Sequence, residues 1–189
     1  MVVIALMAMT IVRVGLTLRG AHYAVVLDAR APHPLQIWRG GRKIADSLRM
    51  AYHPWSLQVA DVDGDGTEEI AVGLTKATRY LPFPHRTLFI MRFDGRQIVR
   101  KWAGSTMGRP LLEFCFGPKE KGKAQTLFTL ETALHGGVAL SAHAWTGFGF
   151  RKIGQERIWK GAKGLSFRGD RLILRVDSHS VSIPWRALL

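Results

Sequence analysis

The chain has 189 residues, of which 47% are hydrophobic and 22% are charged, so it can bury a core and is not disordered along its whole length. Its 20 glycines and 8 prolines are spread along the sequence, which is typical of short strands joined by turns and unfavourable for long helices. The formal net charge of +13 favours a polyanionic neighbour (nucleic acid, anionic lipid or acidic polysaccharide), although a basic surface without a specific partner is equally compatible with it.

The first segment of the chain is apolar. Residues 1–12 contain one polar residue, Thr10, before Arg13 interrupts the run. A membrane helix needs about 20 apolar residues, and a secretory signal normally begins with a basic segment. We therefore expect residues 1–10 to be an apolar N-terminal segment that forms a strand. A signal-like segment, or a membrane anchor that involves residues 1–18, is the alternative.

Two similar segments lie near opposite ends of the sequence. Residues 16–28 and 165–177 match without a gap, about 150 residues apart, and each has two alternating strand patterns around an Arg-Gly turn. Such a pattern predicts a β-hairpin. The interval leaves room for two further copies of about fifty residues. Strand–turn–strand patterns at residues 55–74 and 111–130 are those copies.

A second hairpin is expected after the first one in three of the four repeats. An aromatic residue (Trp38, Phe93 or Trp145) ends one strand, and a glycine turn leads into the next strand. Asp94-Gly95 is the strongest of these turn signals, because Asp-Gly between alternating segments favours a tight hairpin. The repeating unit is therefore four short strands in about fifty residues, which is the size of a propeller blade.

We accordingly expect an all-β fold, a small β-propeller of about four four-stranded antiparallel blades within residues 11–189. A generic antiparallel β protein is the alternative, since all hairpins share the same alternation. The expected blades cover residues 11–46, 54–104, 109–160 and 163–185.

The fourth repeat is expected to lack its last strand. It has a first hairpin and a third strand at residues 181–185, and the sequence ends soon afterwards. Propellers often complete one blade with strands from both termini, so we expect residues 2–7 to supply the missing strand and close the ring. Assembly of two chains into a larger ring is also open.

The segment Asp61–Ile70 lies between the first two strands of the second repeat. Acidic residues occupy alternate positions in it. Carboxylates at alternate positions can point into one concavity and surround a hard cation such as calcium. The intervening Gly64 and Gly66 permit the left-handed backbone that such a loop requires. The expected ligands are the side chains of Asp61, Asp63, Asp65 and Glu69 and the backbone carbonyl of Thr67.

An EF-hand begins with the same pattern, but it needs a glutamate at the twelfth position and helices on both sides. Here the twelfth position is Val72 and both flanks have strand patterns, so an EF-hand is excluded. The pattern Asp-x-Asp-x-Asp-Gly-x-x-Glu followed by Ile-Ala-Val-Gly instead resembles the calcium loop of FG-GAP/VCBS-type repeats, as in integrin α-subunit propellers.

The resemblance implies one structural Ca²⁺ in a loop that joins the first two strands of a blade, bound by the five residues given above. Glu69 stands where the family more often has aspartate. The equivalent turns of the other three repeats carry too few acidic residues, so at most one ion is expected. An acidic turn without an ion is the alternative.

No catalytic residues are expected. The sequence contains no nucleophile elbow and no phosphate-binding loop. Cys115, the only cysteine, lies in an apolar strand pattern and is expected to be a buried thiol. Arg168-Gly169-Asp170 spells a cell-adhesion tripeptide but falls at a predicted hairpin turn. We therefore expect a protein that is not an enzyme, with a propeller-type hydrolase or lyase as a remaining alternative.

The third repeat and its C-terminal flank are the most basic part of the chain and form the candidate contact with an anionic surface. This basic set consists of Lys119, Lys121, Lys123, Arg151, Lys152, Arg157, Lys160 and Lys163.

Together these features predict a non-catalytic binding or assembly module, outside the cytoplasm or at the cell surface, in a larger membrane-associated complex. The expected partners are other protein subunits or an anionic surface of lipid headgroups or polysaccharide. A basic module that binds nucleic acid or acidic polysaccharide is the alternative. A cytoplasmic location and homo-oligomerisation stay open.

Overall fold

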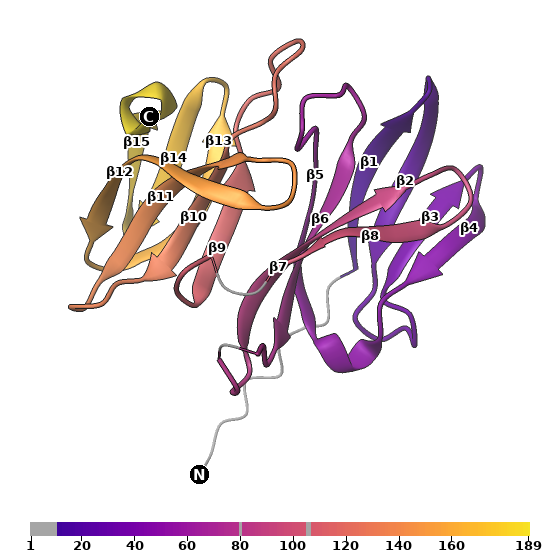
Figure 1. The fold of residues 1–189 in the computed structure, drawn as a ribbon, viewed down its shortest axis with the longest axis horizontal. Helices are drawn as coiled ribbons and strands as arrows, with labels where there is room; N and C mark the ends of the chain where they lie inside the picture. Colours follow the sequence, from indigo (N-terminus) through magenta and orange to yellow (C-terminus); the bar gives the residue numbers. More distant parts are fainter. Residues whose placement is uncertain (1–10, 80, 105–106) are drawn as a thin grey trace.

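The alternating segments of the sequence form four antiparallel sheets in a computed structural model that describes residues 11–79, 81–104 and 107–189 (Figure 1). The first sheet contains β1 (Val12–Leu18), β2 (Ala21–Leu27), β3 (Leu35–Arg39) and β4 (Arg42–Ser47). The second contains β5 (Pro54–Ala60), β6 (Glu69–Lys76), β7 (His85–Phe93) and β8 (Ile98–Ala103). The third contains β9 (Leu111–Phe116), β10 (Leu127–Thr132), β11 (Val138–Trp145) and β12 (Phe150–Trp159). The fourth contains β13 (Ala162–Arg168), β14 (Arg171–Val176) and β15 (His179–Pro184).

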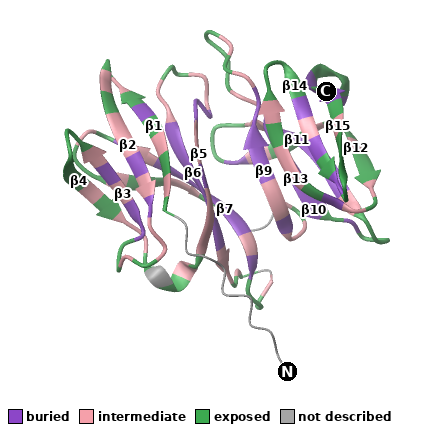
Figure 2. Ribbon diagram, turned by 180° about the vertical axis from the view of Figure 1, so that it is seen from behind, coloured by how far each residue is buried: buried purple, intermediate pink, exposed green. Residues whose placement is uncertain are grey.

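The four sheets are arranged as the blades of a four-bladed β-propeller, which confirms the predicted fold class. In every blade the strands follow one another in chain order, each hydrogen-bonded to the next. The first strands β1, β5, β9 and β13 contact one another in that order, so they form the inner edges of the blades (Figure 1). Figure 2 shows exposed residues gathered on outer strands such as β4 and β12.

Apolar side chains on facing blades form the core. In β6, Ile70 and Val72 point towards blade 1, and Ala71 between them points towards blade 3, because successive side chains of a strand face opposite sides. A third cluster, which includes Phe128 and Leu172, joins blade 3 to blade 4. Within the described ranges no such cluster joins blade 4 back to blade 1.

Blade 4 has three strands, and the segment predicted to complete it, residues 2–7, lies outside the described residues. The hairpin of this blade also differs slightly from the hairpin that it matches in sequence. The turn of blade 1 is Arg19-Gly20, between the paired residues Leu18 and Ala21. The turn of blade 4 is Gly169-Asp170, one residue later than the gapless match implies. Leu165 and Leu174 still pack in the core, as do the residues that they match, Leu16 and Val25.

Short helical turns complete the structure. The 3₁₀ turns η1 (Met50–Tyr52) and η2 (Trp185–Leu188) follow blades 1 and 4. No helix in the part of the chain that the structure describes is long and apolar enough to cross a bilayer.

Cys115 is buried in β9, and this burial raises the pKa of its thiol well above the usual range.

Trp55 of β5 occupies the boundary between blades 2 and 3, and its ring packs against a glycine. The ring lies 5.6 Å from that of Phe114, and the Arg86 guanidinium lies 4.6 Å from its centroid. A Cβ added at Gly73 would approach the indole to 2.6 Å. The glycine therefore makes room for the tryptophan.

We expect Gly73→Ala to lower the free energy of unfolding by about 1–3 kcal/mol, since the indole must move. The control is Gly15→Ala in β1, where an added Cβ meets no atom within 4 Å. That change should alter stability by less than about 0.5 kcal/mol. Urea unfolding measures both, and equal effects would contradict the close packing of Trp55 on Gly73.

Candidate functional site

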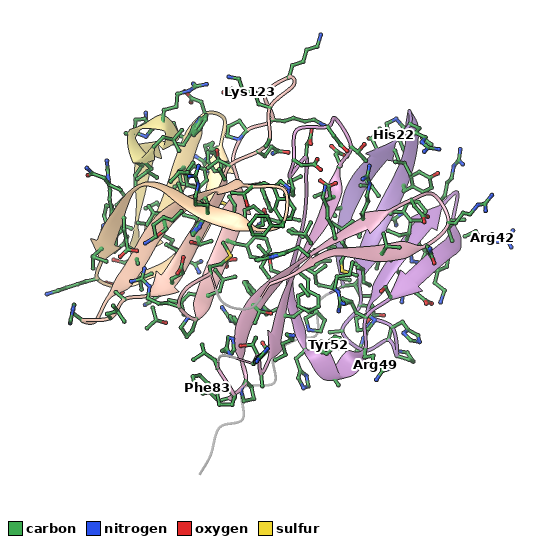
Figure 3. The ribbon with its side chains drawn as sticks, viewed as in Figure 1. His22, Arg42, Arg49, Tyr52, Phe83 and Lys123 are labelled. Carbon is green, nitrogen blue, oxygen red and sulfur yellow. The ribbon has the colours of Figure 1, made fainter. Side chains whose placement is uncertain are left out.

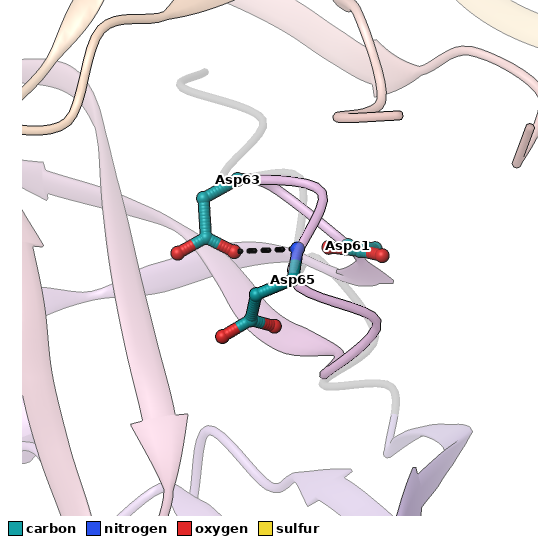
Figure 4. Close-up of side chains that lie close together, drawn as sticks. All are labelled: Asp61, Asp63 and Asp65. Atoms are coloured by element: carbon teal, nitrogen blue, oxygen red, sulfur yellow. Dashed lines mark hydrogen bonds between the residues drawn. The ribbon is translucent and has the colours of Figure 1, made fainter. Parts of the chain in front are cut away.

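The loop between β5 and β6, residues 61–69 (the aspartate loop), brings three of the predicted carboxylates together. Oxygen atoms of Asp61, Asp63 and Asp65 all lie within 4.8 Å of one another (Figure 4). Asp61 is buried, Asp63 is half-buried and Asp65 is exposed. These three residues could hold a metal ion, because a compact set of oxygen ligands suits a hard cation.

The loop is shaped by hydrogen bonds from its own backbone. Asp61 accepts the N–H groups of Gly64 at 2.8 Å and Gly66 at 3.0 Å. Asp63 accepts the N–H of Asp65 at 3.4 Å (Figure 4), and Asp65 accepts that of Thr67 at 2.7 Å. Gly64 and Gly66 have φ of 77° and 85°, the left-handed region that favours glycine. The predicted role of the two glycines is confirmed.

A lysine from the outer strand of the same blade binds the loop. The Lys101 ammonium in β8 contacts the carboxylate of Asp63 and lies 2.6 Å from Oε1 of Glu69. The other oxygen of Glu69 accepts the N–H of Val62 at 3.0 Å. Glu69 is fully buried, and the Lys101 side chain is 15% exposed. The ammonium also lies 5.7 Å from the centroid of the Trp145 ring in blade 3.

The charges around the loop shift the pKa values of its members. Burial raises the pKa of Glu69 above its ordinary value. Burial acts in the opposite direction on Lys101, but its hydrogen bonds to Asp63 and Glu69 prevail and raise the pKa of the ammonium. Burial opposes the ionisation of Asp65, yet the hydrogen bond from Thr67 and the nearby cations lower the pKa of this carboxyl. Lys101 is therefore held as a cation beside the loop.

The aspartate loop also docks on the corresponding turn of blade 3. The N–H of Asp61 donates to Oε1 of Gln125 at 2.8 Å, and the N–H of Gln125 donates to the carbonyl of Asp61 at 2.8 Å. A Cβ added at Gly64 would lie 2.6 Å from the backbone nitrogen of Ala124. The two turns are thus in direct backbone contact.

Glu68 extends these contacts to blade 1. Its Oε2 accepts the N–H of Thr17 in β1 at 2.9 Å, and its Oε1 lies 3.3 Å from Nζ of Lys119 in blade 3. One loop therefore touches three blades at the same end of the propeller, where the first hairpin turns lie (Figure 1).

The predicted ligand set is divided in the structure. Asp61, Asp63 and Asp65 are gathered, whereas Glu69 is outside this group and is bound by Lys101. The predicted role of the Thr67 carbonyl stays a prediction. The sequence did not indicate Lys101, which is 38 residues from Asp63 and reaches it only through the pairing of β7 with β8.

The basic set lies in separate segments. Residues 119–123 belong to the β9–β10 loop, where Figure 3 labels Lys123. Residues 151–157 belong to the outer strand β12, Lys160 follows that strand, and Lys163 lies in β13. Several members have local partners, among them Lys123 with Glu120 at 2.7 Å. Cations along an outer strand also discourage its pairing with other chains.

A buried polar cluster on one face of blade 3 was not predicted. Thr129 donates to Glu131 at 2.7 Å, and its hydroxyl lies 3.0 Å from Nε2 of His143. The imidazole and Glu131 are 3.3 Å apart, and both are buried. Arg109 lies 3.7 Å from Glu131. Polar residues at alternate positions, Thr129 with Glu131 and Ser141 with His143, were the available signal.

The cluster continues outwards to Glu156 of β12. Arg109 binds Glu156 with two nitrogens, Lys152 binds it at 2.6 Å and Ser141 donates to it at 3.2 Å. The hydrogen bonds from Arg109 and Lys152 lower the pKa of Glu156 to about 2. These groups satisfy one another, as buried polar networks require.

Comparison of the chain with protein-family models, with curated proteins and with solved structures finds no significant match.

We expect Gly64→Ala to destabilise the protein by about 2–4 kcal/mol, because the new methyl group meets Ala124 and the backbone is left-handed. The control is Gly66→Ala, which has a similar φ but no atom within 4 Å of the added Cβ. It should cost only about 1–2 kcal/mol of backbone strain. Thermal unfolding of both variants gives the difference, and equal losses would contradict the contact between the turns of blades 2 and 3.

Glu156 should stabilise the protein in a pH-dependent way. Its pKa is about 2 in the folded protein and near 4.5 when unperturbed, so its contribution is complete above about pH 4.5 and is lost as the pH falls towards 2. Glu156→Gln should therefore cost about 1–3 kcal/mol at pH 6 and much less at pH 2.5. The control Asp170→Asn changes an exposed turn residue. A Glu156→Gln deficit that does not depend on pH would refute this role.

Proposed function

We propose that the protein is a non-catalytic module that binds or assembles with a negatively charged partner. The propeller fold suggests a protein-interaction module, since its blades present many loops on a rigid frame. The charge distribution supports an anionic partner, and this is the observation that carries the proposal.

Nearly all the acidic residues are already engaged within the protein. Of the described acidic residues, every one except Asp170 contacts a cationic side chain or accepts a backbone N–H. The 27 basic residues outnumber the 14 acidic ones, which gives a formal net charge of +13, so cations without an acidic partner remain in excess. Such a surface attracts anions over a distance of about 10 Å at moderate salt.

The partner that we propose is an acidic protein subunit or an anionic surface in a membrane-associated complex outside the cytoplasm. The extracytoplasmic setting follows from the resemblance of the aspartate loop to FG-GAP/VCBS-type repeats. Among metal ions, calcium is the one that the donors of the loop would match, because they are all oxygen atoms. The loop is in either case a brace between blades and not a reactive centre.

Binding to anionic vesicles tests the proposal. Vesicles that contain phosphatidylserine should co-sediment with the protein at low salt and release it at high salt, and neutral vesicles should not bind. An acidic polysaccharide and single-stranded DNA compete in parallel, and preference for DNA would favour the nucleic-acid alternative.

A pair of charge-reversal variants locates the contact. Lys121→Glu/Lys123→Glu should weaken binding at least tenfold if the β9–β10 loop is the contact. The control Arg42→Glu/Lys43→Glu makes the same change of charge in blade 1, where Arg42 lies at the right-hand edge of Figure 3, away from Lys123. Absence of binding to vesicles, polysaccharide and DNA alike at low salt would overturn the proposal.

A further inference from the structure

The aspartate loop differs from a calcium loop in one respect: its negative charge already has a cation. Asp63 and Glu69, two of the four implied side-chain ligands, are joined by the Lys101 ammonium. An ion bound to the same two oxygens as the ammonium would lie close to this nitrogen. Two cations cannot share that place without strong repulsion.

The other two implied side-chain ligands also make contacts within the protein. Both oxygens of Asp61 accept backbone N–H groups, and Asp65 binds the N–H of Thr67 and lies 3.3 Å from the Arg92 guanidinium. The residues therefore fit an ammonium better than they fit a dissolved metal ion.

We propose that the ammonium of Lys101 is the resident cation of the aspartate loop and takes the place of calcium. It fastens the loop to β8 and makes the contact between blades 2 and 3 independent of metal. This inference rests on the role of the loop as a brace and is independent of the identity of the anionic partner.

The burial of Glu69 explains why a cation is needed. A fully buried carboxylate is costly unless it is paired and hydrogen-bonded, and here Lys101 and the N–H of Val62 supply both interactions. The lysine side chain also packs near the ring of Trp145, which attracts the cation. A cation on the chain itself loses no translational freedom on binding, unlike an ion taken from solution.

The central variant is Lys101→Met, which keeps the length of the side chain and removes the charge. Without the ammonium, the loop should lose stability and become able to bind calcium. In EDTA the melting temperature should fall by about 5–10 °C, and millimolar Ca²⁺ should restore most of it. Lys43→Met is the control, since it removes the same charge from an exposed pair with Asp46 and should respond to neither reagent.

The unaltered protein is titrated with Ca²⁺ by calorimetry and by thermal unfolding, which keeps the test decisive if Lys101→Met does not fold. Its melting temperature should change by less than about 1 °C between EDTA and Ca²⁺, with no heat of binding. Stabilisation of this protein by several degrees would overturn the proposal. So would a Lys101→Met variant that is as stable as the parent, or one that Ca²⁺ does not rescue.

Discussion

The ion pair between Lys101 and the buried Glu69 neutralises a charge at the boundary between blades 2 and 3. A carboxylate with no exposed surface must pair with a cation or become protonated. Loss of the pair with Lys101 would therefore loosen the loop that the pair holds. Through Asp63, Glu68 and Gln125 the same loop connects β8, the first strand of blade 1 and the turn of blade 3. The positions of three blades at this end of the propeller therefore depend on the aspartate loop, whose buried charge at Glu69 is neutralised by Lys101.

The blades use their two faces differently. Apolar residues join neighbouring blades into three clusters, and blade 3 carries in addition a polar face in which Glu131, His143 and Arg109 satisfy one another. Among the described acidic residues only Asp61, Glu69 and Glu131 are buried. The others lie nearer the surface, where basic residues outnumber them, 27 against 14 in the whole sequence. The basic surface follows from this excess of cations, and it is the property that an anionic partner would recognise.

Local patterns were sufficient to predict the blades, because period-two alternation and glycine turns are properties of neighbouring residues. The clustering of Asp61, Asp63 and Asp65 followed from their spacing in the same way. Lys101 and Gln125 were beyond such reasoning, since they lie 38 and 64 residues from the groups that they bind. The polar cluster of blade 3 is an intermediate case: alternating polar residues in β10 and β11 were visible, but their shared face depends on the strand register.

The most direct test of the account is a crystal structure of the unaltered protein grown in millimolar calcium. The account predicts that the Lys101 ammonium lies between Asp63 and Glu69, with no metal ion among the aspartates. A calcium ion with oxygen ligands at about 2.3–2.6 Å, and Lys101 turned away from the loop, would contradict it.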